Sequence, residues 1–272
     1  MPVEVDLSGR VALITGGGGG IGAGIAGVLA RAGAHVVIAE RDPSRAADTR
    51  AVISGTGGAV EAVVVDVQTR EGVAELANEV LSAHGRADIL VNNVGHYLRP
   101  TAFEDSDEEH WDALHSVNFL HVMRCTKAFL PAMVVQGSGS VINVASVEGL
   151  RGYPPDPVYG AYKAAVVHFT RCLALELAPR GIRVNAIAPD VTQTIQVDYG
   201  SIPPDLADRW PIWVPVGRVG EPSDNADVVL FLASDLSRFV VGQVIPTDGG
   251  TLTAGGWFRT RRGRWTNRPR DP

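Results

Sequence analysis

Short apolar runs alternate with longer segments of helical periodicity along most of the chain. The runs are rich in Val and Ile, and their apolar residues mostly follow one another without a polar residue at every second position. This pattern is typical of strands that are covered on both faces of a parallel sheet. We therefore expect about seven strands, at 10–15, 35–40, 59–67, 87–93, 139–146, 182–189 and 242–250.

The segments between these runs predict helices at 20–32, 70–84, 107–135, 157–179 and 222–234. Alternation of strand and helix predicts an α/β fold, a Rossmann-type doubly wound parallel sheet with helices on both faces and right-handed crossovers. A length of 272 residues fits one domain that spans 1–272.

Two segments depart from this alternation. Residues 190–216 are rich in proline and contain Tyr199, Trp210 and Trp213. The two tryptophans either indicate that this segment contacts a bulky apolar ligand or only hold the segment to the body of the protein. The tail at 257–272 holds six arginines and no lysine. It could meet an anionic substrate group, contact a neighbouring subunit, or be a solvated tail.

Composition and charge exclude several classes of function. A net charge of −6 gives no reason to expect nucleic acid as a partner. No apolar segment reaches the length of a membrane helix, and the start of the chain does not resemble a signal peptide. The two cysteines, Cys125 and Cys172, form no disulfide framework, which favours the cytoplasm. We predict no metal site.

A run of five glycines, residues 16–20, joins the first predicted strand to the first predicted helix. Small residues there allow a tight turn and let a pyrophosphate approach the helix N-terminus, where N–H groups and the helix dipole favour an anion. A flexible turn without a binding role is the alternative. The predicted cofactor contacts in this segment are Gly16, Gly19, Gly20, Ile21 and Gly22.

The second predicted strand ends in Glu40. An acid at this position is placed to accept hydrogen bonds from the adenosine ribose hydroxyls, and it would repel a 2′-phosphate. It therefore favours NAD over NADP. Arg41 is the counter-argument, since it could turn toward a 2′-phosphate, but Gly19 leaves the glycine loop without a basic side chain.

Two further strand ends carry candidate cofactor contacts. Asp66, followed by Val67, ends the third predicted strand and could accept a hydrogen bond from the adenine amino group. Alternatively, Asp66 caps the next helix. The fourth strand is followed by Asn93 and Gly95 in the segment NNVG. Amides there can tie neighbouring strand ends together, and Gly95 lets the backbone approach the cofactor.

The candidate catalytic residues lie in and before the segment VYGAYK. Tyr159 and Lys163 are four residues apart and so share one face of a predicted helix, whereas Tyr162 has no lysine at that spacing. Ser146 ends a predicted strand thirteen residues before Tyr159. Together with TGGGGGIG, NNVG, Asn118 and the late VVGQVIPTDGG, these residues resemble the short-chain dehydrogenase/reductase family over about residues 8–250.

The resemblance implies a role for each matching residue. Tyr159 would be the general acid/base, and Lys163 would favour its phenolate and hold the nicotinamide ribose. Ser146 would donate a hydrogen bond to the substrate oxygen, and Asn118 would position a water of the proton relay. Pro189 and Thr194 would contact the nicotinamide end of the cofactor. Residues 190–216 lie where the family has its substrate-covering segment, so we expect them to form a lid over the substrate. Two positions depart from the family pattern, Asp190 in place of glycine and Val94 in place of alanine.

We therefore expect an NAD(H)-dependent oxidoreductase that interconverts a secondary alcohol and a ketone. Its partner would be a small-molecule carbonyl or alcohol substrate, with a bulky apolar one as the case that the two tryptophans favour. The resemblance implies a homotetramer. One alternative is an NADPH-dependent 3-oxoacyl reductase acting on acyl-carrier-protein or CoA thioesters. Another is a dinucleotide-binding sensor without catalysis, since one fold can carry several functions.

Overall fold

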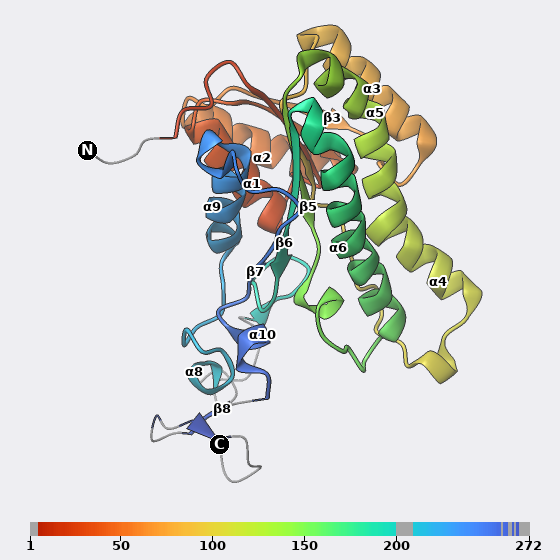
Figure 1. Cartoon of the computed structure of the whole chain (residues 1–272), viewed down its shortest axis with the longest axis vertical. Helices are drawn as coiled ribbons and strands as arrows, with labels where there is room; N and C mark the ends of the chain where they lie inside the picture. Colours follow the sequence, from red (N-terminus) through yellow and green to blue (C-terminus); the bar gives the residue numbers. More distant parts are fainter. Residues whose placement is uncertain (1–4, 200–208, 257, 261–262, 264, 267–272) are drawn as a thin grey trace.

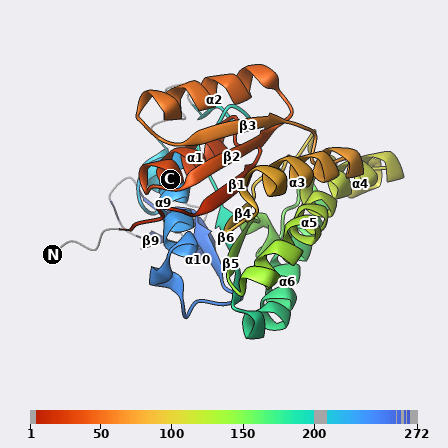
Figure 2. The ribbon, with the colours of Figure 1, turned by 90° about the horizontal axis from the view of Figure 1, so that it is seen from above.

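A computed structural model describes residues 5–199, 209–256, 258–260, 263 and 265–266 of the chain. Within this described part, seven parallel strands form one sheet in the order β3-β2-β1-β4-β5-β6-β7. The strands are β1 (Val11–Thr15), β2 (His35–Glu40), β3 (Val60–Val64), β4 (Ile89–Asn92), β5 (Gly139–Val144), β6 (Ile182–Pro189) and β7 (Val244–Thr247). The predicted doubly wound fold, drawn as a whole in Figure 1, is therefore confirmed, because the order reverses between β1 and β4 (Figure 2).

Helices cover both faces of the sheet (Figure 2). One face carries α1 (Gly20–Arg31), α2 (Pro43–Gly55) and α9 (Pro222–Ala233). The other carries α3 (Arg70–His84), α5 (His121–Gln136) and α6 (Pro157–Leu177). Neighbouring strand residues enter different cores: Val36 packs with the α1 side and Val37 with the α3 side. This two-sided burial explains why the strands are continuous apolar runs.

The long helix predicted at 107–135 is divided in the structure. It consists of α4 (Glu108–His115), a π-helical segment at Ser116–Leu120, and α5. The other short helical elements are Phe103–Asp105, Val147–Gly149, Ala178–Arg180, α8 (Trp210–Trp213), Asp235–Ser237 and α10 (Thr251–Ala254). The π segment contains Asn118, and such irregular turns often occur at functional sites.

The sequence did not predict α2. Its N-terminus has clear signals, because the Asp42 carboxylate accepts hydrogen bonds from the Ser44 and Arg45 amides and Pro43 follows the cap. However, only Ala46, Thr49 and Ile53 of this helix are buried. So few buried positions, two of them small or polar, leave no apolar stripe for a periodicity search to detect.

The predicted lid and tail are only partly described. Residues 200–208 of the lid, and Arg261, Arg262, Arg264, Arg268 and Arg270 of the tail, lie outside the described residues. Near the chain end, β8 (Phe258–Arg259) pairs antiparallel with β9 (Trp265–Thr266). In the described part of the chain, no helix combines the length and apolar character needed to cross a membrane.

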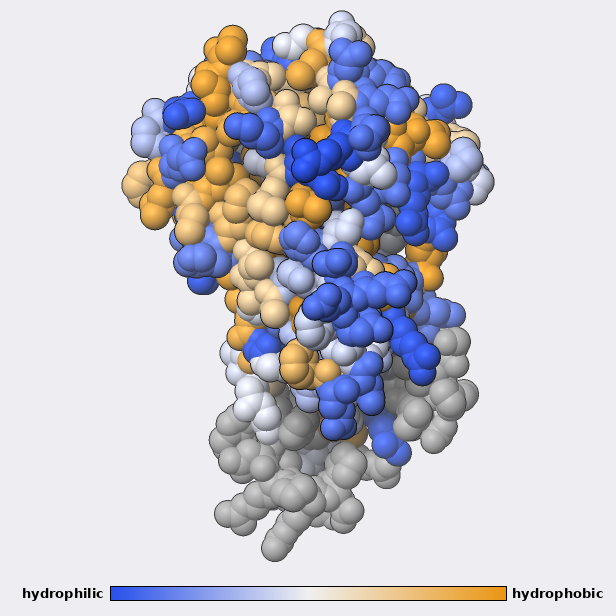
Figure 3. Space-filling view, turned by 90° about the vertical axis from the view of Figure 1, so that its right-hand side faces the viewer, coloured by the Kyte–Doolittle hydropathy of each residue, from blue (hydrophilic) through white to orange (hydrophobic). Residues whose placement is uncertain are grey.

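Apolar and polar side chains share the face of the molecule shown in Figure 3. Two apolar side chains of the helices on this side are largely solvent-exposed, Val135 of α5 at 89% and Leu175 of α6 at 79%. The predicted homo-oligomer remains a prediction.

Candidate active site

A cleft of about 610 Å³ lies beyond the C-terminal ends of the strands and spans the switch point between β1 and β4. This is where ligands bind in doubly wound sheets. It is lined by nearly all of the residues predicted from the sequence: Gly16, Gly19, Gly20, Ile21, Glu40, Asp66, Val67, Asn93, Gly95, Ser146, Tyr159, Lys163, Pro189 and Thr194. Gly22 and Asn118 are buried next to the cleft.

The glycine loop has a geometry that side chains would obstruct. Gly16 and Gly20 have φ values of 65° and 52°, in the left-handed region. A Cβ atom on Gly22 would lie 2.2 Å from the Gly16 carbonyl oxygen, so the first turn of α1 packs directly on the loop. Among the described residues no side chain caps α1, and its first turn holds no acid. These N–H groups fit the pyrophosphate of a dinucleotide.

Glu40 points back toward this loop. Its Oε2 atom accepts a hydrogen bond from the Gly18 amide at 3.2 Å, and its Oε1 atom accepts from the Arg41 and Asp42 amides at 2.9 and 3.1 Å. A Cβ atom on Gly18 would lie 2.6 Å from Glu40 Cγ. The carboxylate is therefore fixed beside the loop and lines the cleft, and Arg41 and Arg45 line the same region.

The two interpretations of Asp66 can be separated by the contacts of α3. The cap of that helix is Thr69, whose Oγ1 accepts a hydrogen bond from the Gly72 amide at 3.0 Å. Asp66 instead accepts from the Gln68 amide at 2.9 Å and lines the cleft together with Val67. The alternative of a helix cap is therefore wrong, and the adenine contact remains a prediction.

Asn93 links two strand ends. Its Nδ2 atom donates to the carbonyl oxygens of Thr15 and Gly16 at 3.0 and 3.1 Å, and its own amide donates to Thr15 Oγ1 at 2.9 Å. Thr15 was not singled out in the sequence, although it is a polar residue at the end of an apolar strand. The residue before it in the motif, Asn92, donates to Asn143 Oδ1 at 2.9 Å on the neighbouring strand.

Tyr159 and Lys163 lie on the first turns of α6, which begins at a buried cap. The Asp156 Oδ1 atom accepts from the Tyr159 amide at 3.0 Å, and Oδ2 lies 2.9 Å from His110 Nε2. The Lys163 Nζ atom donates to the Val144 carbonyl oxygen at 3.1 Å and lies 5.8 Å from the centre of the Tyr159 ring.

Ser146 and Asn118 approach this pair from two other elements. Ser146 Oγ accepts from the Glu148 amide at 3.2 Å and donates to the Pro189 carbonyl oxygen at 3.5 Å. The Asn118 amide exchanges two hydrogen bonds with the backbone of His96, at 2.8 and 3.1 Å. Asn118 therefore fixes the chain that follows Gly95. Its predicted role in holding a water is not tested by these contacts.

Burial dominates the electrostatics of the catalytic candidates. It raises the pKa of the Tyr159 phenol well above the ordinary value, and the neighbouring Ser146 hydroxyl offsets this only in part. It lowers the pKa of Lys163 to about 8, because the charged amine loses its hydration. In the protein alone, Tyr159 is therefore protonated at neutral pH. The Lys163 charge does not by itself bring this phenol toward neutral pH.

The comparisons with known proteins agree with this geometry. Residues 17–252 match the family model described as enoyl-(acyl carrier protein) reductase. The chain is 38% identical over 246 residues to 3-oxoacyl-(acyl-carrier-protein) reductase of Thermotoga maritima, covering 90% of this chain and 99% of that protein. The chain belongs to the short-chain dehydrogenase/reductase family.

Solved structures of family members superpose closely on this fold. Levodione reductase has a TM-score of 0.86 at 34% identity, covering 91% of this chain and 99% of that chain. A 7α-hydroxysteroid dehydrogenase complexed with NADH and 7-oxo glycochenodeoxycholic acid has a TM-score of 0.85 at 31% identity, covering 91% and 96%. The chain is thus an oxidoreductase of a family that binds NAD(P).

Asp190, which departs from the short-chain dehydrogenase/reductase pattern, is held by neighbouring side chains. Its Oδ2 atom accepts from Arg151 Nη2 at 3.0 Å and from Thr251 Oγ1 at 2.5 Å. Arg151 also pairs with Glu148 at 2.8 Å. Asp190 lines the cleft, but its charge is already paired with Arg151. It therefore serves to join the segment after β5 to the segment after β6.

The aromatic residues of the predicted lid differ in position. Tyr199 lines the cleft. Trp210 does not line it and packs edge-on against Tyr199, with ring centres 5.1 Å apart. Trp213 also lies outside the cleft lining and is 57% exposed. In this arrangement neither tryptophan contacts the cleft directly, which favours the interpretation that they hold the lid segment.

Three residues that contact elements of the site in this chain were missed. Thr15 anchors Asn93, Asp156 caps the helix of Tyr159, and Ile195 packs against the glycine loop, where a Cβ on Gly19 would lie 2.7 Å from Ile195 Cδ1. Asp156 had a usable signal, because Asp followed by Pro157 is typical of a helix N-terminus. Ile195 had none, since its contact depends on how residues 190–199 fold back.

Proposed function

We propose that this protein interconverts a ketone and a secondary alcohol with NAD(H), and that Tyr159 is the general acid/base. The observation that carries this proposal is the juxtaposition of Tyr159, Ser146 and the buried Lys163 in one cleft with the glycine loop. The glycine loop lies more than 100 residues before these three side chains in the sequence. A sensor that only binds a dinucleotide would have no need of the catalytic set.

The roles follow from the position of each group. When bound, the nicotinamide supplies or accepts the hydride. In reduction, the Tyr159 hydroxyl donates its proton to the carbonyl oxygen, and the Ser146 hydroxyl stabilises that oxygen by a hydrogen bond. Lys163, held by the Val144 carbonyl, places a positive charge near the phenol and favours the phenolate that remains. In oxidation, the same phenolate accepts the proton.

For the substrate, the relatives favour a 3-oxoacyl thioester over a simple ketone. The relatives from Thermotoga maritima, Chlamydia pneumoniae and Synechocystis are each named 3-oxoacyl-(acyl-carrier-protein) reductase, at 36–38% identity. A 3-oxoacyl thioester is also a ketone, so the proton and hydride transfers are the same. We therefore propose this thioester class as the substrate that the relatives support best, which refines the general ketone activity.

For the cofactor, Glu40 favours NAD(H). Its carboxylate is fixed by three backbone amides beside the loop, so a 2′-phosphate in this region would meet a negative charge. Arg41 and Arg45 line the same end of the cleft and are the groups that would receive such a phosphate. The fixed acid opposes them.

The test is an assay of purified protein on simple ketones and 3-oxoacyl-CoA with NADH and NADPH. Tyr159→Phe should lower kcat by at least ~100-fold while NADH still binds, because only the transferable proton is lost. The matched control is Tyr162→Phe, on the same helix, which should keep nearly full activity. Near-normal turnover of the Tyr159 variant would overturn the catalytic assignment.

A further inference from the structure

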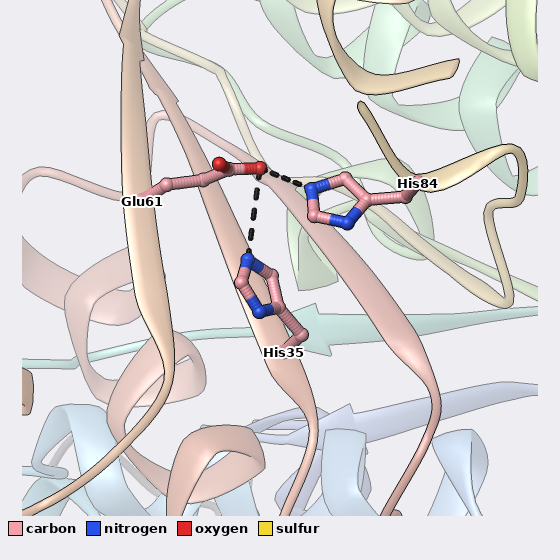
Figure 4. Close-up of side chains that lie close together, drawn as sticks. All are labelled: His35, Glu61 and His84. Carbon is pink, nitrogen blue, oxygen red and sulfur yellow. Dashed lines mark hydrogen bonds and ion pairs between the residues drawn. The ribbon is translucent and has the colours of Figure 1, made fainter. Parts of the chain in front are cut away.

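A second group of side chains with metal-binding atoms lies near the N-terminal ends of strands β2 and β3, at the opposite end of these strands from the cleft. His35, Glu61 and His84 point toward one another in Figure 4, and their donor atoms all lie within 4.8 Å of one another. Glu61 Oε1 is 2.5 Å from His84 Nε2 and 3.7 Å from His35 Nε2. Two imidazole nitrogens therefore approach the same carboxylate oxygen.

The topology explains why these three residues meet. Val36 of β2 pairs with Val60 of β3, so His35 and Glu61 are diagonal neighbours on one face of the sheet. This face also carries Val37 and Val63, which pack in the core formed with α3. His84 is the last residue of α3, the helix that covers this face of the two strands. Three elements thus contribute one donor each.

We propose that His35, Glu61 and His84 form a binding site for one divalent transition-metal ion, with Zn²⁺ as the reference ion. Two imidazole nitrogens and one carboxylate oxygen are a common ligand set for such ions. Ligand atoms about 2.0–2.2 Å from zinc lie roughly 3–4 Å from one another, so only small shifts are needed here. Solvent would complete the coordination, since the three side chains are 17–40% exposed.

The environment of His35 favours a cation over a closed hydrogen-bonded cluster. Its Nε2 atom is buried and forms no hydrogen bond with any described residue, although it faces the carboxylate. A shared cation would satisfy this nitrogen and Glu61 Oε1 together, whereas His84 alone can satisfy only the carboxylate. An unpartnered buried nitrogen aimed at an acid is costly unless a ligand completes it.

The proposed metal would have no part in hydride transfer. His35 begins β2 and Glu40 ends it, and the five residue-to-residue steps between them span about 17 Å. The site instead joins edge strand β3, its neighbour β2 and the end of α3. A bound ion would therefore stabilise the folded state and leave the cleft unchanged.

The experiment is a titration of metal-free, untagged full-length protein with ZnCl₂, followed by calorimetry and by thermal unfolding. We expect one Zn²⁺ per chain, micromolar or tighter affinity, and a rise in Tm. CoCl₂ should give visible absorption bands of a protein-bound ion. Glu61→Gln and His84→Gln should each weaken Zn²⁺ binding at least ~10-fold, abolish the rise in Tm, and keep normal kcat.

The matched control is His168→Gln, since exposed His168 lies 3.5 Å from the Cys172 sulfur and forms with it a second pair of side chains that could bind zinc. This variant should bind Zn²⁺ like the wild type. The proposal is overturned if zinc binds only at millimolar concentration, if Glu61→Gln and His84→Gln bind it normally, or if binding is lost in His168→Gln instead. Normal circular dichroism of both cluster variants excludes misfolding as the cause of a loss.

Discussion

Replacing Lys163 by methionine should abolish activity and at the same time stabilise the protein. Lys163 is 3% exposed, and burial lowers the pKa of its amine from 10.5 to about 8. At neutral pH the folded protein therefore holds a charge in an environment that disfavours it. Methionine is of similar length, carries no charge, and adapts to irregular packing.

The magnitude follows from the change in pKa. A difference of about 2.5 units corresponds to roughly 3 kcal/mol at 1.36 kcal/mol per unit. The substitution also leaves the Val144 carbonyl oxygen without its donor at 3.1 Å, which costs about 1–2 kcal/mol. We expect the Lys163→Met variant to be more stable by about 1–2 kcal/mol at pH 7. For a chain of this size, that is a rise in Tm of roughly 2–8 °C.

The sign of the pH dependence distinguishes two causes of a stability gain in Lys163→Met, the removal of a buried charge and an improvement in packing. Between pH 8 and 10.5 the unfolded chain keeps a proton on this lysine that the folded protein has lost. Since the unfolded state binds more protons, the stability of the wild type rises with pH across this window. The advantage of Lys163→Met should therefore shrink between pH 7 and 9.5.

The assay is urea denaturation of both proteins at pH 7, 8 and 9.5 without cofactor. Lys127→Met, which alters an exposed lysine of α5, is the control and should show no comparable change. The reasoning is refuted if Lys163→Met is no more stable than the wild type at pH 7. It is also refuted if a stability gain persists unchanged at pH 9.5.

Three further predictions concern the positioning of catalytic and cofactor groups. Asp156→Ala removes the cap of α6 and should destabilise the protein by about 1–2 kcal/mol in urea denaturation, with a larger loss in kcat than in KM, whereas Asp156→Asn should retain most of both. Gly22→Ala places a Cβ 2.2 Å from the Gly16 carbonyl oxygen and should weaken NADH binding at least ~10-fold by fluorescence titration, while Gly55→Ala, in open space, should not. Glu40→Ala removes the fixed carboxylate and should narrow the ratio of kcat/KM for NADH over NADPH; an unchanged ratio would mean that Glu40 does not select the cofactor.

The sequence predicted the strands well because both faces of this sheet are buried. Each strand is then a continuous apolar run, and its polar end residue marks the ligand side of the sheet. Helices with a buried stripe were also predicted, as for α3 and α9. Helix α2 was not predicted for the opposite reason. It covers the edge of the sheet with few buried residues, which are mostly small or polar, so the sequence shows no apolar stripe with helical periodicity.

Side-chain partners were harder to predict than positions. Asp66 and Thr69 are both able to cap α3, and only the contacts assign the cap to Thr69. Asp190 was identified as a departure from the family, but its pairing with Arg151 and Thr251 joins segments that are distant in sequence. Which side chain pairs with which at such positions depends on the loops that lie next to one another in the fold. The local sequence around each residue does not determine this.

At the π segment, Ser116–Leu120, an unpredicted irregularity of a helix and an unpredicted set of side-chain partners occur together. A continuous α-helix from Glu108 to Gln136 would place Asn118 by regular periodicity, and the apolar pattern gives no sign of an interruption. The wider turn instead lets Asn118 exchange two hydrogen bonds with the His96 backbone while still bonding the Leu114 carbonyl at 3.1 Å. The chain after β4 is thereby fixed against Lys163, which would lie 2.9 Å from a Cβ on Gly95. The irregular turn therefore lies where the hydrogen bonds of the site require a geometry that a regular α-helix does not provide. Local periodicity in the sequence does not predict such a turn.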